Sequence, residues 1–206
     1  MPCTCESAGH LKEKNEMSNT TYADILYPST KGKALLYDAV LVIGGSWLVA
    51  LGAQISILLP SSPAPITGQT LAVLLVGALL GSRRGALSLL AYLGEGIAGL
   101  PVFAGGMVGL PYLLGPTGGY LVGFVAAAFI TGLLAESGWN RRMETAFLAM
   151  LMGNIVIYVF GLPWLGCFVG AEKVFSAGLY PFILGDLLKA ASSAMLLPGG
   201  WRLIGR

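Results

Sequence analysis

Six apolar segments make up most of the chain, and they limit its possible folds more than any other feature. By residue number they are 35–59, 70–81, 86–100, 119–135, 145–160 and 181–198. A helix needs about 20 apolar residues to cross a bilayer, so 70–81 and 86–100 are short for a full crossing. Only 11% of the 206 residues are charged, against about 25% in a soluble domain. We therefore predict an all-α integral membrane protein with six transmembrane helices, two of them tilted or recessed.

The basic residues indicate how these helices are oriented. Of the 12 Lys and Arg residues, Lys173 lies in the fifth connection and Lys189 within the last apolar segment. The other ten lie in the tails or the even-numbered connections: Lys12, Lys14, Lys31, Lys33, Arg83, Arg84, Arg141, Arg142, Arg202 and Arg206. Because cytoplasmic loops carry the excess of Lys and Arg, we predict that both termini are cytoplasmic. The longer connections 60–69, 101–118 and 161–180 would then face outward.

The first 33 residues are polar and show no apolar periodicity, so we predict a disordered cytoplasmic tail over 1–33 and one membrane domain over 34–206. Cys3, Cys5 and His10 are metal-ligating residue types, but in a polar tail we expect no metal site there. Together with Cys167, the cysteines are too few and too scattered for a disulfide framework.

The last apolar segment contains two opposite charges, Asp186 and Lys189. Charges inside a bilayer are costly and usually face the bundle interior or a water-filled cavity. Residues three apart on a helix lie on one face, so two interpretations are open. The pair lines a buried polar pocket for a small solute, or it is an intrahelical ion pair without further function. In the predicted topology both residues lie about one to two turns below the outer surface, so such a pocket would open outward.

The segment 100–118 is rich in glycine and proline and carries no charge. A regular spanning helix is therefore excluded, and the segment is too apolar for an ordinary solvated loop. Irregular apolar backbone at membrane depth is tolerated where it packs on protein or lines a cavity. We expect a lid or a pocket wall here.

Several classes of activity are excluded by the residues. The single histidine, His10, lies in the tail, which excludes histidine-dependent membrane hydrolases. Asp38 and Asp186 partly match the motifs of intramembrane aspartyl proteases, but the topology puts them at opposite faces, whereas a carboxylate dyad must be adjacent. No phosphate-binding loop is present, so the chain cannot itself hydrolyse ATP. The pairs Arg83-Arg84 and Arg141-Arg142 are too sparse for nucleic acid and suit lipid headgroups. We predict no enzymatic activity and no nucleic-acid partner.

Five motifs, in this order, resemble those of the BioY family, the biotin-specific substrate-binding (S) components of energy-coupling-factor (ECF) transporters. They are PITGQTLAVLL at 65–75, LGSRRG at 80–85, GLPVFAGG at 99–106, GPTGGY at 115–120 and GDLLKA at 185–190. The resemblance extends over about residues 35–203.

This resemblance implies a six-helix, S-component-like bundle in the cell membrane that captures biotin from outside. It also implies partners: a transmembrane T component and two ABC-type ATPases, which use the ATP, while this chain holds no cofactor. The alternative is a self-sufficient secondary transporter of biotin or another small solute. In that case transport is facilitative, or Asp186 carries a coupling proton.

The resemblance also assigns roles within the pocket. Asp186 would accept hydrogen bonds from the ureido N–H groups of biotin, and Lys189 would donate to the ureido carbonyl or to the carboxylate. Further candidates for substrate binding are polar, aromatic and glycine residues. They are Asn154, Gln69, Thr67, Gly105, Gly106, Gly115, Thr117, Tyr120, Tyr112 and Trp164.

Some of these residues have equally simple structural explanations. Asn154 would serve a helix–helix hydrogen bond, Gln69 and Thr67 would cap the second helix, and Tyr112 and Trp164 would anchor the chain at the membrane interface.

Small residues recur along one face of the first apolar segment. These are Ser46, Ala50 and Ala53, at spacings i, i+4 and i+7. Small residues let helix backbones approach closely in membranes. The stripe is therefore predicted either to meet the T component, as the resemblance implies, or to pack within the chain's own bundle.

Overall fold

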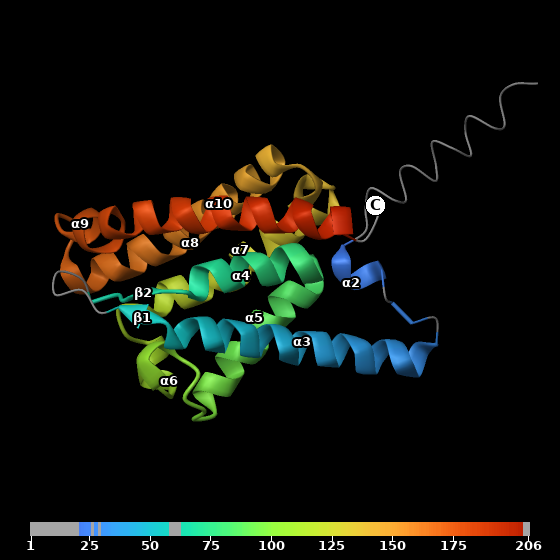
Figure 1. The fold of residues 1–206 in the computed structure, drawn as a ribbon. Coiled ribbons are helices and arrows are strands. Elements are labelled where there is room, and N and C mark those ends of the chain that lie inside the picture. The colour runs from blue at the N-terminus through green and yellow to red at the C-terminus, as the bar shows by residue number, and fades with distance from the viewer. Residues whose placement is uncertain (1–20, 26, 29, 58–62, 204–206) are drawn as a thin grey trace, which may run out of the picture.

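The computed structural model describes residues 21–25, 27–28, 30–57 and 63–203, which form a mainly helical bundle (Figure 1). The longer helices, in chain order, are α3 (Lys31–Gln54), α4 (Gln69–Leu80), α5 (Ser82–Ile97), α7 (Gly118–Glu136), α8 (Met143–Val169) and α10 (Tyr180–Leu203). The short elements are α2 (Tyr22–Ile25), β1 (Ser56–Ile57), β2 (Ile66–Thr67), η1 (Ala104–Gly106), α6 (Leu110–Leu113), η2 (Trp139–Arg141) and α9 (Val174–Gly178). Each predicted apolar segment overlaps one of the longer helices. The end of the first segment, predicted at residue 59, is wrong, because α3 ends at Gln54 and β1 begins at Ser56.

Four helical stretches among the described residues are long and apolar enough to cross a membrane. They are Lys31–Gln54, Gly118–Glu136, Met143–Val169 and Val174–Arg202. With 12 and 16 residues, α4 and α5 are about 18 and 24 Å long, less than the ~30 Å of a bilayer's hydrocarbon core. That all six helices cross, with both termini inside, stays a prediction.

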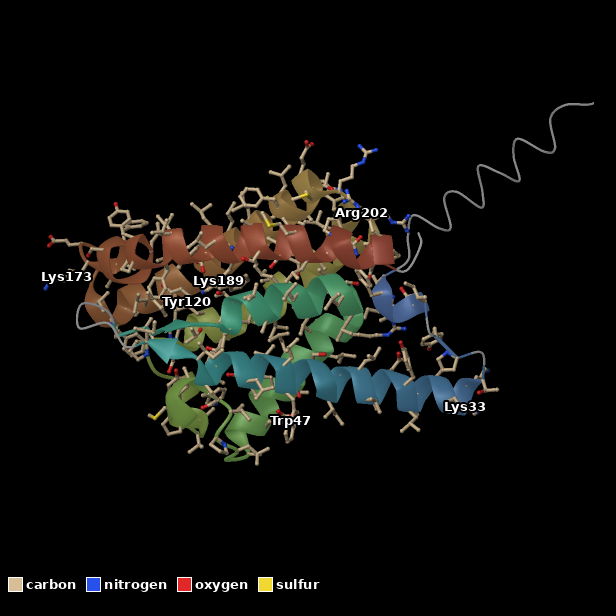
Figure 2. All side chains as sticks on the ribbon, in the orientation of Figure 1. Lys33, Trp47, Tyr120, Lys173, Lys189 and Arg202 are labelled. Carbon is tan, nitrogen blue, oxygen red and sulfur yellow. The ribbon has the colours of Figure 1, made fainter. Side chains whose placement is uncertain are left out.

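Charged side chains lie toward the two ends of the bundle. Figure 2 shows Lys33 and Arg202 at one end and Lys173 at the other, while Trp47 points away from the bundle on α3. Trp47 is 62% exposed, and Leu35 and Leu51 on the same helix are similarly exposed. An apolar middle between charged ends is the distribution that a bilayer requires.

The helices α4, α7 and α8 approach each other closely through glycine. A Cβ atom at Gly77 of α4 would overlap Thr131 and the Ala128 carbonyl of α7, and one at Gly153 of α8 would overlap Leu74 of α4. Small residues at such crossings allow van der Waals packing in a membrane protein. These three helices therefore form the centre of the bundle.

The predicted irregular segment is confirmed. Residues 98–117 contain only the short elements η1 and α6. Gly99, Gly105, Gly106 and Gly109 have φ values of +98°, +69°, +73° and +86°, a region that side-chain-bearing residues rarely occupy. We call residues 98–117 the lid. An antiparallel β1–β2 pair, with Ser56 opposite Thr67, lies at the same end of the bundle (Figure 1).

The predicted connection 161–180 is wrong over most of its length. Helix α8 continues through Pro163 to Val169, and α9 follows at Val174–Gly178. Proline removes one backbone hydrogen bond, but membrane helices tolerate this loss when neighbouring elements pack on them. Gly161 packs directly against the ring of Tyr120 on α7, which holds α8 in place on the N-terminal side of Pro163.

The predicted tail also ends earlier than residue 33. Thr21 and Ala23 are 1% and 5% exposed, α2 is helical, and α3 already begins at Lys31. Cys3, Cys5 and His10 lie outside the described residues, so the absence of a metal site there stays a prediction.

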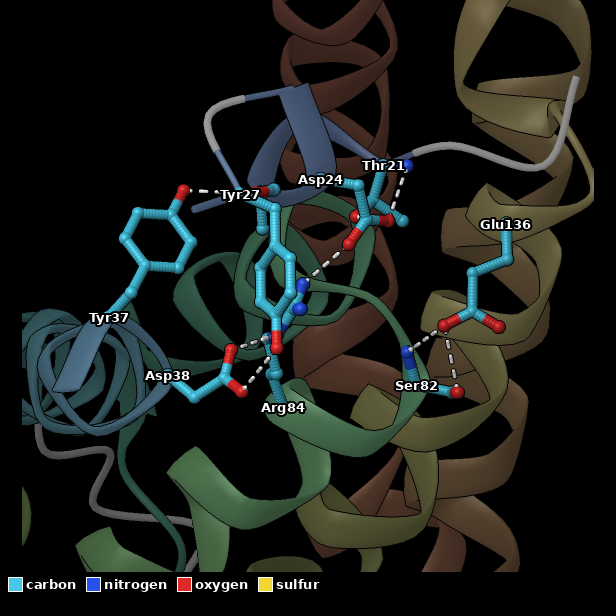
Figure 3. A network of polar contacts seen from close by, with 9 residues as sticks. Thr21, Asp24, Tyr27, Tyr37, Asp38, Ser82, Arg84 and Glu136 are labelled. Carbon is cyan, nitrogen blue, oxygen red and sulfur yellow. Dashed lines mark hydrogen bonds and ion pairs between the residues drawn. The ribbon is translucent and has the colours of Figure 1, made fainter. Parts of the chain in front are cut away.

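Ion pairs hold this N-terminal segment on the bundle (Figure 3). Arg84 of α5 binds the Asp24 carboxylate through Nη1 and the Asp38 carboxylate of α3 through Nε, each at 2.7 Å. The ring of Tyr27 lies 4.9 Å from the guanidinium carbon. On the other side of α2, the ring of Tyr22 packs on Trp201 of α10. We call Asp24, Asp38 and Arg84 the N-terminal clasp, because they join α2, α3 and α5.

Candidate ligand-binding site

A cavity lies between the segment 64–70, the lid and the helices α7, α8 and α10. Its empty space, with the open mouth included, amounts to about 560 Å³. Its apolar walls come from α6, α7, α8 and α10. They are Tyr112, Tyr120, Leu121, Phe124, Ile157 and Phe182.

Polar groups converge on one side of this cavity, around Asp186 of α10. Asp186 is 6% exposed, and its two oxygens have different partners. Oδ1 accepts from the Thr70 hydroxyl at 3.3 Å, while Oδ2 accepts a hydrogen bond from the Tyr158 hydroxyl. Three helices, α4, α8 and α10, therefore hold this carboxylate.

Lys189 lies beside Asp186, and the ion pair between them forms, with Nζ 3.3 Å from Oδ1. Nζ also donates to the Thr67 carbonyl and to the Thr70 hydroxyl, each at 2.8 Å. A lysine ammonium has three N–H donors, and all three are engaged by protein atoms. The two interpretations of this pair are thus compatible, because both residues also line the cavity. Figure 2 shows Lys189 on α10 near Tyr120.

A second polar group lies at the start of α4. Gln69 is 4% exposed and lines the cavity. Its Nε2 donates to the Tyr92 hydroxyl at 2.6 Å, and its Oε1 accepts from the Thr67 hydroxyl at 3.3 Å. The Thr67 hydroxyl also accepts from the Gln69 backbone N–H at 3.3 Å. Thr67 of β2 therefore binds the first backbone N–H of α4, and both Thr67 and Gln69 line the cavity.

The structure brings seven of the twelve predicted substrate-binding residues to the cavity. These are Thr67, Gln69, Tyr112, Thr117, Tyr120, Asp186 and Lys189. Gly105, Gly106, Gly115, Asn154 and Trp164 do not line it. A direct role of these five residues in binding stays a prediction.

Structural roles account for most of the residues outside the cavity. Trp164 donates from its indole N–H to the Gly115 carbonyl at 2.9 Å, which fixes the end of the lid to α8. Gly105 and Gly106 have open space where a Cβ would lie, so they supply positive φ angles rather than a close approach. Asn154 is 5% exposed, and among the described residues neither atom of its amide has a hydrogen-bond partner. We have no physical account of this amide.

The stripe on the first long helix is mostly inside the bundle. Ser46 and Ala53 are fully buried, and Ala50 is partly buried. The Ser46 hydroxyl lies 2.9 Å from Oε1 of Glu95 on α5. This burial favours packing within the chain over a surface for a partner.

Comparison with known proteins decides the family. The model of the BioY family matches residues 20–206. The chain belongs to the BioY family. A probable biotin transporter BioY from Pyrococcus horikoshii is 44% identical over 149 residues, covering 72% of this chain and 86% of the relative. The biotin transporter BioY of Rhizobium etli is 40% identical over 158 residues, covering 72% and 84%.

A solved structure agrees with this assignment. The crystal structure of the S-component for biotin from an ECF-type ABC transporter superposes with a TM-score of 0.71 at 25% identity, covering 87% of this chain and 96% of that one. This member of the BioY family is therefore a multi-pass membrane protein of a transporter family, with the S-component fold.

Sequence reasoning missed several residues that line the cavity. Tyr158, Thr70 and Phe182 are the most important of them. Tyr158 and Thr70 hydrogen-bond to Asp186, and this contact could have been sought by asking which polar side chains can satisfy a buried carboxylate. Phe182 lies four residues before Asp186, on the same face of the helix.

Proposed function

We propose that this chain captures biotin at the outer face of the cell membrane and delivers it inward. The observation that carries the proposal is the cavity itself, in which the Asp186–Lys189 pair lies next to apolar and aromatic walls. Biotin has the matching parts: a ureido group with N–H donors and a carbonyl, an apolar ring and chain, and a carboxylate. The names of the relatives support the same substrate.

In this proposal Asp186 accepts from the ureido N–H groups, and Lys189 donates to the ureido carbonyl or to the carboxylate. Hydrogen bonds to charged groups in a shielded site are the strong kind. Phe124, Ile157 and Phe182 line the cavity and would contact the apolar ring and chain. Thr117 and Gln69 provide further polar contacts.

The topology we propose has six crossings with both termini in the cytoplasm, so that the cavity opens outward. We further propose coupling to an ECF module with a T component and two ABC-type ATPases. The likeness to the S-component structure supports this partner set.

Titration of purified protein with biotin tests the site. We expect Asp186→Asn to weaken binding by roughly 10- to 100-fold, because the substitution replaces a charge-assisted acceptor, worth about 1.5–3 kcal/mol, with an amide that turns a donor toward donors. Glu172→Gln is the matched control, since Glu172 is exposed and outside the cavity; its affinity should equal that of the wild type. Unchanged affinity of Asp186→Asn would refute the assignment.

Native mass spectrometry of protein purified from biotin-containing medium should show the mass of the bound ligand.

Uptake assays identify the source of energy. With an ECF module present, we expect uptake by cells expressing this chain to follow ATP and to be lost when the ATPases are inactivated. Uptake by the chain alone that a protonophore abolishes and ATP depletion does not would instead show a self-sufficient, proton-coupled transporter.

A further inference from the structure

Behind the cavity wall, a fully buried tyrosine holds one of the lining side chains. Tyr92 of α5 is 0% exposed and does not line the cavity. Its hydroxyl receives a hydrogen bond from Nε2 of Gln69 at 2.6 Å and donates to the Val102 carbonyl of the lid at 3.1 Å. A buried tyrosine hydroxyl needs such partners, and here they connect the cavity to the lid.

The chemistry of these partners fixes the orientation of the Gln69 amide. A backbone carbonyl only accepts, so the one hydroxyl proton of Tyr92 goes to Val102. The Tyr92 oxygen can then only accept from Gln69, and the NH₂ end of the amide must face it. The Oε1 end consequently turns to the other side, where the Thr67 hydroxyl donates to it at 3.3 Å. A reversed amide would leave the Val102 carbonyl without the Tyr92 proton, or it would place the Gln69 and Tyr92 oxygens together without a proton between them.

Packing within the lid keeps the Tyr92 ring in place. The ring meets Phe103 edge to face, with centroids 5.6 Å apart, and Phe103 stacks on Tyr112 of the cavity wall at 5.0 Å. Gly96 of α5 leaves the room that the Phe103 ring occupies, since a Cβ there would overlap it. The hydroxyl therefore has a fixed location relative to the cavity.

We infer that Tyr92 is a positioning residue for ligand binding. It acts through Gln69, because it orients the Gln69 amide. The second N–H of this amide and the second lone pair of its Oε1 then have fixed positions and are available to the cavity. This inference rests on the proposed function, because the ligand used to test it is biotin. Tyr92 itself does not touch the ligand.

A double-mutant cycle on purified full-length protein tests this. We expect Tyr92→Phe to weaken biotin binding by roughly 3- to 10-fold, which corresponds to about 0.7–1.4 kcal/mol. We expect Gln69→Leu to weaken it at least as much. In the double variant the loss should equal that of Gln69→Leu alone, because Tyr92 acts only through Gln69. Tyr22→Phe, which removes a hydroxyl bonded to the Leu197 carbonyl at the other end of the bundle, is the matched control and should bind like the wild type.

Several results would overturn the inference. Losses that add in the double variant would make Tyr92 a structural residue only, and wild-type affinity of Tyr92→Phe would exclude the role altogether. If Tyr92→Phe does not fold, Gln69→Glu provides a second test, because a carboxylate offers no N–H to the Tyr92 hydroxyl. The Gln69→Glu variant should bind biotin at least 3-fold more weakly than the wild type. Wild-type affinity of Gln69→Glu would contradict the inference. Wild-type protein without any affinity for biotin would overturn the proposed function and this inference together.

Discussion

At the scale of single residues, glycines decide how closely the central helices pack. Gly77 lies where α4 crosses α7, and a Cβ there would overlap the Thr131 side chain and the backbone carbonyl of Ala128. A backbone atom cannot move aside as a flexible side chain can. The close approach of these helices therefore depends on the missing side chain.

We expect Gly77→Ala to destabilise the protein by about 1–3 kcal/mol, because overpacking forces backbone shifts of that cost. Thermal unfolding in detergent would measure it. Gly44→Ala is the matched control: Gly44 lies within α3, and a Cβ added there would have nothing within 4 Å, so alanine should be neutral or stabilising by up to about 1 kcal/mol. Equal unfolding temperatures for the two variants would contradict this account.

The candidate site was only partly predictable at this scale. Asp186 and Lys189 stand out in a sequence because charges are rare in apolar segments. Tyr158 and Thr70 do not, since both residue types are ordinary in membrane helices. Their importance follows from the position of the Asp186 carboxylate in three dimensions, which brings Tyr158 of α8 and Thr70 of α4 to the same group. The residue spacing within any one segment does not indicate that these three side chains come together.

At the scale of elements, the sequence located the helices better than their ends. Proline normally ends a helix, and the predicted end of the fifth span before Pro163 follows from that rule. The structure continues α8 to Val169, because tertiary packing outweighs the lost backbone bond. The N-terminal segment was wrongly predicted to be disordered up to residue 33. It has no apolar periodicity, and its position is set by the ion pairs of Asp24 and Asp38 with Arg84.

The N-terminal clasp should contribute measurably to stability. We expect Arg84→Ala to lower the free energy of unfolding by about 1–2 kcal/mol, because two charge-assisted hydrogen bonds are lost at a partly exposed site. The unfolding temperature should fall by roughly 2–8 °C. Arg83→Ala is the matched control, since the neighbouring Arg83 is exposed and its removal should have little effect.

Acid provides a second readout of the clasp. Burial alone would raise the pKa of the Asp24 carboxyl, but hydrogen bonds from Arg84 and Thr21 outweigh burial and hold this pKa below its ordinary value of 3.8. A lowered pKa in the folded state stabilises the protein above the ordinary value, and this stabilisation is lost as the pH falls through the folded pKa. The difference between wild type and Arg84→Ala should thus be constant near neutral pH and shrink below about pH 4. A difference that persists unchanged in acid would show that Arg84 acts through packing alone.

At the scale of the whole molecule, the bundle brings distant irregular segments to one end. The segment that leads into α4, the lid and the first turns of α10 are separated in sequence by complete helices, yet all three line one cavity. The β1–β2 pair and α9 lie at the same end of the bundle (Figure 1). The sequence analysis predicted that the connections 60–69, 101–118 and 161–180 lie at one end, because odd-numbered connections of an up-and-down bundle are on the same side.

That topology can be measured with thiol labelling. In a background where Cys3, Cys5 and Cys167 are serine, we expect Lys173→Cys to react with a membrane-impermeable maleimide in intact cells. Arg142→Cys, in the connection before α8, should react only after the membrane is permeabilised. The reverse pattern, or labelling of both positions in intact cells, would show that the proposed orientation is wrong.

The bonding of Lys189 has a consequence for selectivity. Each of its three N–H groups already has a protein acceptor, so a ligand that takes one of them must exchange places with Thr67, Thr70 or Asp186. The net free energy of such an exchange is the small difference between the hydrogen bond that Lys189 loses to the protein and the one that it forms with the ligand. A molecule that displaces a protein group without replacing its bond in full would be rejected, and discrimination between close chemical relatives would exceed what the number of contacts suggests.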